Sequence, residues 1–124
     1  MPDNKILIST GTLSMEATLL EGPASSQFKN LLPLAGSANI WGDEIYFRIP
    51  VEGELESPKE VVEIGDLGYW PPGSAFCLFF GLTPASQCEE IRAAREVTVI
   101  GKIKGDSTIL KRVSSGSSVI IQAV

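Results

Sequence analysis

A run of seven residues without a charge, Ala75 to Gly81 (AFCLFFG), constrains the fold of this chain more than any other stretch. A strand this apolar must be buried on both faces or belong to a sheet that closes on itself. Pro71 and Pro72 lack ladder donors, so the chain must bend just before the run. Tyr69 and Trp70 stand directly ahead of that bend. They either plug the core or form the wall of a binding site.

The rest of the chain is typical of short β-strands separated by turns rich in glycine and proline. We expect strands at Lys5–Ser9, Ser14–Leu20, Ser37–Gly42, Glu44–Ile49, Glu60–Ile64, Leu67–Trp70, Val97–Ile103 and Ser118–Val124. In EIYFRI, alternation sends Ile45, Phe47 and Ile49 to one face and Glu44, Tyr46 and Arg48 to the other. Pro50 to Lys59 is predicted to be an acidic loop.

Two short helices complete the predicted elements. Ser25 or Ser26 is expected to cap the first, in which Phe28, Leu31 and Leu32 share one face. The second follows Lys104-Gly105-Asp106 and turns Ile109, Leu110 and Val113 inward. The pattern predicts a single domain, residues 1–124, that is mainly β. Its seven to nine short strands suggest a closed barrel or a sandwich, and the helices would cover the openings of a barrel.

The charge balance argues against a nucleic-acid partner. The formal net charge is −5, and between Asp43 and Asp66 eight acidic residues stand against two basic ones. Nucleic-acid binding needs clustered Lys and Arg that neutralise phosphates. The acidic stretch is either a solvated loop or a docking surface for a basic partner.

The sequence also predicts that the protein avoids membranes. No apolar run approaches the roughly 20 residues that a membrane-spanning helix needs. The opening residues, MPDNKILIST, lack an apolar segment followed by a small-residue cleavage site. We therefore expect a cytoplasmic protein.

The absence of histidine removes several kinds of chemistry from consideration. Histidine-dependent triads, imidazole general bases and the commonest zinc ligand are all excluded. Cys77 and Cys88 are too few and too far apart for a zinc site. Cys77 is interpreted as a small buried hydrophobe, and both thiols are expected to be reduced. We expect no metal and no cofactor.

Several stretches resemble the cyclophilin barrel. VTVIGKIKGDSTILKRV, Val97 to Val113, is similar to the cyclophilin pattern of an apolar strand ending in Gly-Lys-Val, a glycine turn and a helix before the final strand. WGDEIYF, GDLGYWPPG and CLFFGLTP together look like the compact prokaryotic cyclophilin-like proteins, whose functions are mostly unassigned. This resemblance implies a closed antiparallel barrel of about eight strands, with two short helices capping its ends.

The resemblance also suggests a catalytic candidate. Cyclophilins polarise the prolyl amide with an arginine in a Phe-His-Arg-Ile-Ile-Pro context, and FRIP, Phe47 to Pro50, is similar, which makes Arg48 the candidate. An alternative register places Asn39, Glu44 and Tyr46 there instead. The family's Gln-Gly-Gly-Asp motif, tryptophan and histidine have no counterparts, so peptidyl-prolyl isomerase activity is expected to be weak or absent.

Three functions are compatible with these residues. The leading hypothesis is a groove rimmed by aromatic residues that binds a short or proline-containing peptide. The residues expected to form it are Asn39, Glu44, Tyr46, Phe47, Trp70 and Phe80. The second is a pocket for an amide or carboxylate metabolite, on which Glu44, Tyr46 and Asp66 would converge, with the two carboxyls available for acid–base work. The third is a non-catalytic subunit that docks to a partner protein.

Overall fold

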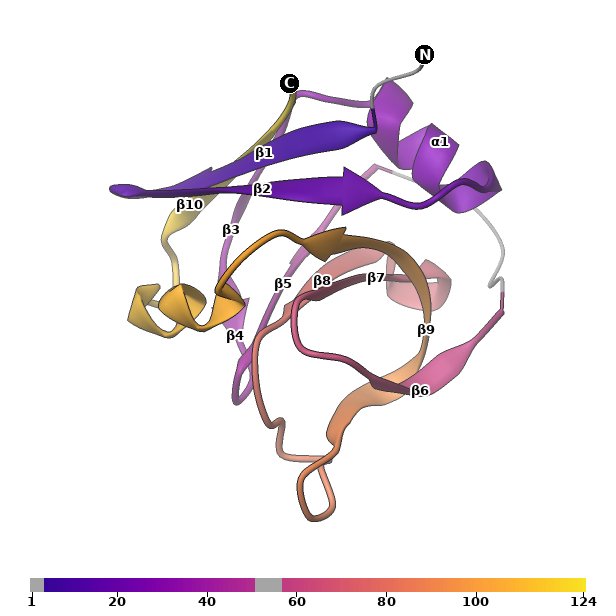
Figure 1. Ribbon diagram of the computed structural model, residues 1–124, viewed down its shortest axis with the longest axis vertical. Coiled ribbons are helices and arrows are strands. Elements are labelled where there is room, and N and C mark those ends of the chain that lie inside the picture. Colours follow the sequence, from indigo (N-terminus) through magenta and orange to yellow (C-terminus); the bar gives the residue numbers. More distant parts are fainter. Residues whose placement is uncertain (1–3, 51–56) are drawn as a thin grey trace.

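The computed structural model describes residues 4–50 and 57–124. It contains ten strands, one α-helix and two 3₁₀-helices (Figure 1). In chain order the elements are β1 (Lys5–Thr10), β2 (Leu13–Leu19), α1 (Pro23–Asn30), β3 (Leu34–Ser37), β4 (Asn39–Ile40), β5 (Glu44–Arg48), β6 (Lys59–Val62), β7 (Asp66–Trp70), η1 (Pro71–Gly73), β8 (Ala75–Phe79), β9 (Ile91–Ile103), η2 (Ser107–Arg112) and β10 (Ser118–Ala123). The prediction of a mainly β chain with few helices is confirmed.

The strands form one curved antiparallel sheet that stays open. Hydrogen-bonded neighbours follow the order β3-β10-β1-β2-β9-β7-β8-β5-β4, and β6 pairs with β9 beside this path. Within the described residues no ladder links β3 back to β5. The prediction of a closed barrel of eight strands is therefore wrong, both in closure and in strand number.

Strands β3 and β5 approach each other without forming a ladder. A Cβ atom added to Gly36 on β3 would lie 2.3 Å from Cδ2 of Phe47 on β5, so a phenyl ring occupies the space between these strands. Between β3 and β4, Ala38 bonds to another segment: its N–H donates to the Ser117 carbonyl (2.8 Å), and its carbonyl accepts from Gly116 N–H (2.8 Å). Side-chain packing therefore replaces a ladder here.

The charge-free segment is buried on both faces, as predicted. Phe76 and Leu78 of β8 point into the main core inside the curved sheet, where Phe76 stacks on Phe28 of α1 with ring centroids 4.7 Å apart. Cys77 and Phe79 point outward into a second cluster. The other members of that cluster are Val62, Ala93 and Val97.

The second cluster exists because β9 is much longer than the sequence indicates. Val97 was expected to begin this strand, but β9 starts at Ile91 and runs for 13 residues. Its second half pairs with β2 and β7, whereas its first half pairs with β6. Figure 1 shows β9 curving around β7 and β8. Its first half therefore covers part of the outer face of the sheet.

The helical predictions hold in part. Helix α1 begins at Pro23 after Gly22, and Ser25 does not cap it: the Ser25 hydroxyl donates to the Ile100 carbonyl at 3.1 Å. Phe28 faces the core as expected, but Leu31 is exposed because it follows the helix. The expected second helix is the 3₁₀-helix η2, which buries Leu110.

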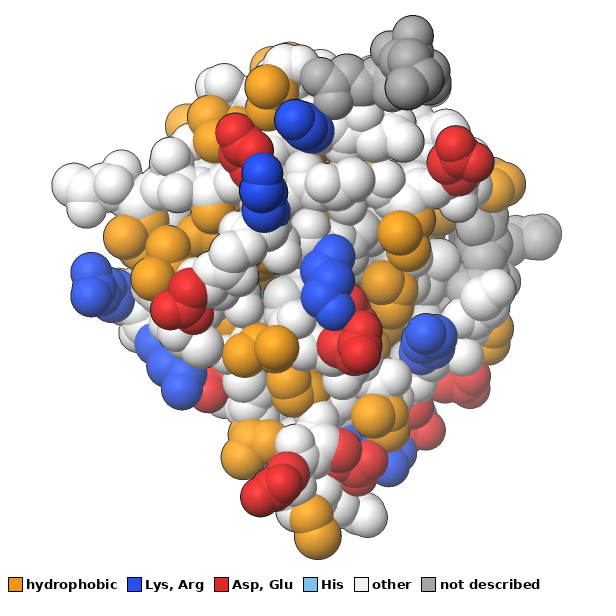
Figure 2. Space-filling view, viewed as in Figure 1, with side chains coloured by type: hydrophobic (Ala, Val, Ile, Leu, Met, Phe, Trp, Pro, Cys, Tyr) orange, Lys and Arg blue, Asp and Glu red, His pale blue; other side chains and the backbone are white. Residues whose placement is uncertain are grey.

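The predicted acidic loop, Pro50 to Lys59, lies mostly outside the described residues, which omit 51–56. Figure 2 shows acidic and basic side chains interspersed on the face of the molecule that it presents. In the described part of the chain, no helix has the length and apolar character needed to cross a membrane.

Candidate functional site

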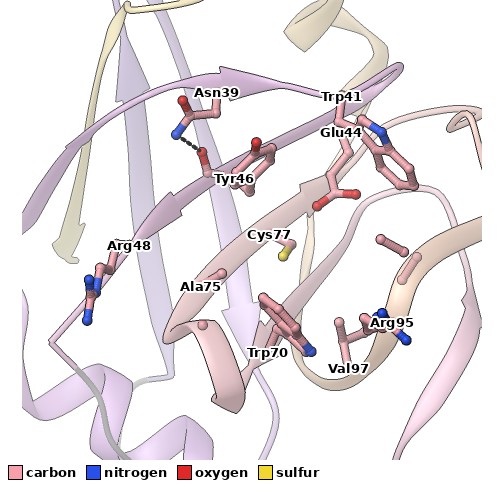
Figure 3. A pocket seen from close by; sticks show the side chains of 13 residues that line it. Asn39, Trp41, Glu44, Tyr46, Arg48, Trp70, Ala75, Cys77, Arg95 and Val97 are labelled. Atoms are coloured by element: carbon pink, nitrogen blue, oxygen red, sulfur yellow. Dashed lines mark hydrogen bonds between the residues drawn. The ribbon is translucent and has the colours of Figure 1, made fainter.

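A pocket of about 410 Å³ opens on the outer face of the sheet, over β5 and β8 and beside the first half of β9 (Figure 3). The β4–β5 hairpin contributes Asn39, Trp41, Glu44, Tyr46 and Arg48. Strands β7 and β8 with η1 contribute Trp70, Gly73, Ala75 and Cys77, and β9 contributes Ala93, Ala94, Arg95 and Val97.

Strand alternation explains which side chains reach the pocket. On β5, Ile45 and Phe47 are buried in the main core, so the side chains between them face outward. On β8 the same alternation brings out Cys77. The antiparallel register places Tyr46 directly opposite Cys77. Two neighbouring strands therefore form the floor of the pocket.

Glu44 is the most unusual residue of this floor. It is only 5% exposed, although it directly follows the hairpin turn at Trp41, Gly42 and Asp43. Its Oε1 has no hydrogen-bond partner among the described residues. Burial raises the pKa of Glu44 to about 7, opposed by a hydrogen bond with Cys77. Near neutral pH the carboxyl is therefore divided between its protonated and ionised forms.

Cys77 is held as a neutral thiol. It is 5% exposed, and burial raises its pKa well above the usual value, with a further increase from the neighbouring Glu44 carboxyl. A thiol in this state is a weak nucleophile. The hydrogen bond between Cys77 and Glu44 opposes the rise in the pKa of the carboxyl, and the buried Oε1 of Glu44 has no partner among the described residues.

Aromatic rings form much of the pocket wall. In Figure 3 the indoles of Trp41 and Trp70 lie on either side of the space in front of the Glu44 carboxyl, and Tyr46 lies along the floor. Asn39 donates from Nδ2 to the Tyr46 carbonyl at 3.1 Å, which joins β4 to β5 beside the pocket. Trp70 packs so closely on Gly73 that an added Cβ would lie 2.4 Å from the indole.

The two arginines of the pocket occupy its rim. Arg48 and Arg95 are both exposed, and neither forms an ion pair with a carboxylate in the described parts of the chain. In Figure 3 the guanidinium of Arg48 points away from Glu44. The pocket thus has an acidic, aromatic interior and a basic rim.

Five of the predicted site residues line this pocket: Asn39, Glu44, Tyr46, Arg48 and Trp70. Their roles in ligand binding and catalysis stay predictions. Phe47 and Phe80 do not line it, because both are buried in the main core.

Asp66 is also outside the pocket, so its predicted convergence with Glu44 and Tyr46 is wrong. Its Oδ2 accepts from Glu63 N–H at 2.8 Å, and its Oδ1 lies 3.8 Å from Lys102 Nζ. Burial raises the pKa of Asp66, but the groups that stabilise its charge belong to the β6–β7 turn and β9. The carboxyls of Glu44 and Asp66 therefore do not form an acid–base pair in one cavity.

Sequence reasoning missed the contribution of β9. Ala93, Ala94 and Arg95 lie ahead of Val97, where the strand was expected to begin. The stretch IRAARE has no regular alternation, so its local pattern carries no signal of a strand. Among the described residues no three Asp, Glu or Cys side chains form a group able to hold a metal ion.

The fold and pocket together define a small antiparallel β-domain with a ligand-sized cavity on the outer face of its sheet. A family model described as cyclophilin-like matches residues 4–122, and the chain therefore belongs to the cyclophilin-like family. Its fold is similar to the solution structure of a hypothetical protein from Archaeoglobus fulgidus, with 42% identity and a TM-score of 0.83. That match covers 98% of this chain and 95% of the archaeal one. No curated protein matches the sequence.

Proposed function

We propose that this domain binds a small organic molecule in the outer-face pocket and holds it through a hydrogen bond to Glu44. The observation that carries the proposal is Glu44, which lines the cavity and whose buried Oε1 has no partner among the described residues. A buried oxygen without a partner costs free energy, typically about 1–3 kcal/mol. A ligand that donates to this oxygen recovers that cost.

The dimensions and walls of the pocket support the same proposal. Its volume of about 410 Å³ lies within the range of about 300–1,000 Å³ that is usual for small-molecule sites. Such sites combine apolar and aromatic walls with a few polar groups that fix the orientation of the ligand. Trp41 and Trp70 supply the walls, and Glu44 supplies the polar group.

Ligand-observed NMR with a diverse set of neutral, cationic and anionic fragments tests this function. Ala94 lines the pocket and is exposed, so Ala94→Phe fills the cavity without disturbing the core. Gln27→Phe, on an exposed position of α1, is the matched control. We expect fragments that bind the wild type and Gln27→Phe but not Ala94→Phe. If no fragment distinguishes the two variants, the pocket is not a small-molecule site.

A short extended peptide is the second candidate, and the position of β4 favours it. β4 is the last strand of the hydrogen-bonded path, and its two residues, Asn39 and Ile40, are exposed. An edge strand can pair with an added strand, and this one borders the aromatic pocket. A proline-containing peptide bound along β4 would bring side chains toward Tyr46 and Arg48.

The isomerase version of this second candidate assigns a role to Arg48. A donor on the prolyl amide would lower the barrier of about 18–20 kcal/mol to rotation. A prolyl-isomerisation assay that compares the wild type with Arg48→Ala tests this role. Equal rates for the two proteins would remove Arg48 as a catalytic residue, and titration of the same peptide would still show whether it binds.

A further inference from the structure

We propose that the ligand of this pocket carries an organic ammonium group, a protonated amine with alkyl substituents, which sits against Glu44 between the indoles of Trp41 and Trp70. The inference rests on the proposed small-molecule function and specifies the chemistry of its ligand.

The hydrogen-bonding groups near Glu44 favour a ligand group that only donates over one that must also accept. The thiol of Cys77 already donates to the carboxyl, and Nδ2 of Asn39 already donates to the Tyr46 carbonyl. The carbonyl of an amide ligand would need a donor as well; these two are occupied, and the remaining side-chain donors of the lining are the Tyr46 hydroxyl, the two indole N–H groups and the rim arginines. A substituted ammonium needs only an acceptor for its N–H, and the Glu44 carboxylate, whose Oε1 has no partner among the described residues, is such an acceptor.

The aromatic walls complete a site for a cation. Indole is the ring that attracts a positive charge most strongly, and the attraction reaches about 2 kcal/mol or more when the cation is desolvated. Trp41 and Trp70 flank the space in front of Glu44, and Tyr46 adds a third ring to the lining (Figure 3). Alkyl groups on the nitrogen would pack on these rings.

The charged and titratable side chains that face the pocket are consistent with this assignment. Glu44 and Arg48 come from β5, Cys77 from β8 and Arg95 from β9. Both arginines are exposed, so water and salt screen their repulsion of a cation. Within the described residues Glu44 has no basic partner of its own, and a bound ammonium would supply the missing positive charge.

The tryptophan content of the chain provides a selective NMR signal for binding in the pocket. Its only two tryptophans, Trp41 and Trp70, both line the pocket. The two indole N–H signals in a ¹H–¹⁵N spectrum therefore report on the pocket directly. Three probes of nearly equal shape isolate the effect of charge: N,N-dimethylethanolammonium, the neutral 3-methyl-1-butanol and the anion 3-methylbutanoate.

We expect the ammonium probe to move both indole signals and to bind at least about tenfold more tightly than the neutral alcohol. Glu44→Gln should remove this tenfold preference for the ammonium over the alcohol. Affinity for the ammonium should rise about tenfold between pH 6 and pH 8, because Glu44 ionises across this interval. The alcohol should show no such dependence.

Three results would overturn the assignment. The alcohol binding as tightly as the ammonium would show a pocket that does not select charge, and tighter binding of 3-methylbutanoate would show that the arginines dominate. In both cases the proposed function stands. If none of the three probes moves the indole signals, the cation assignment also fails, and the fragment comparison with Ala94→Phe decides separately whether the pocket binds other molecules.

Discussion

Cys77 lies diagonally across the β5–β8 ladder from Glu44, and its thiol is hydrogen-bonded to the Glu44 carboxyl. Glu44 is paired directly with Phe79, two residues beyond Cys77, so the two side chains emerge on the same outer face. Burial raises the pKa of both groups; the Glu44 carboxyl raises the pKa of Cys77 further, whereas the hydrogen bond with Cys77 lowers that of Glu44. The Glu44 carboxyl and the Cys77 thiol are therefore the buried titratable groups of the pocket.

The stability of the protein should therefore fall as pH rises, through Glu44. Its pKa is about 7 in the folded state against 4.5 as the ordinary value, so the folded protein holds a proton that the unfolded chain releases. The stabilisation is complete below about pH 4.5 and is lost as pH rises through 7. The shift corresponds to on the order of 3 kcal/mol. Denaturant unfolding followed from about pH 5 to pH 8 measures this change.

The variant Glu44→Gln tests the origin of that change. Glutamine keeps the shape of the side chain but does not titrate, so the variant should gain stability relative to the wild type as pH rises. Glu96→Gln, at an exposed position of β9, is the matched control and should keep the wild-type profile. If the free energies of unfolding of the wild type and Glu44→Gln changed in parallel with pH, Glu44 would not be held in a desolvated site.

The two cysteines should differ sharply in reactivity. Cys77 is buried with a raised pKa, whereas Cys88 is exposed, and the two are not bridged. Because the thiolate is the reactive form, iodoacetamide should label Cys88 in the native protein and leave Cys77 intact until unfolding. Peptide mapping by mass spectrometry measures both sites. In Cys88→Ser, rapid labelling of the folded protein would contradict the burial of Cys77.

Gly73 should control the position of a pocket wall. A Cβ atom at this residue would lie 2.4 Å from the Trp70 indole, which is too close to be accommodated without movement. Gly73→Ala should therefore displace the Trp70 ring and shift its indole N–H signal, while the signal of Trp41 stays in place. Gly105→Ala has no atom within 4 Å of the added methyl; its φ of +87° strains only the local backbone, so it is a control in which the Trp70 signal should stay in place. An unchanged Trp70 signal in Gly73→Ala would contradict this packing.

Local sequence pattern was sufficient to predict much of the fold. Alternation along EIYFRI correctly separates Ile45 and Phe47 from Tyr46 and Arg48, because in a half-buried strand every second side chain reaches the core. A break between strands at Asp43 was also predicted, and Gly42, in the turn that makes this break, has a positive φ of +60°. These features depend on neighbours a few residues apart.

The features that could not be predicted depend on distant segments. The residues of IRAARE that begin β9 include alanine, arginine and glutamate, which intrinsically favour helix, and the ladder with β6 overrides that preference. Only this pairing brings Ala93 and Val97 over the outer face of β8. Glu44 follows a turn and would be solvated without that cover, so its burial is invisible in the local pattern.

The contact between Gly36 and Phe47 should determine how tightly the two ends of the sheet approach. An added methyl at Gly36 would lie 2.3 Å from Cδ2 of the Phe47 ring, and Phe47 is only 3% exposed, so the ring has little room to move. Gly36→Ala should therefore cost about 1–3 kcal/mol, as expected for overpacking a core. Phe47→Leu removes part of the ring, and the alanine should cost less in that background. Denaturant unfolding of the wild type, both single variants and the double variant measures the coupling. Additive losses would mean that the ring does not separate β3 from β5, and the open ends of the sheet would need another cause.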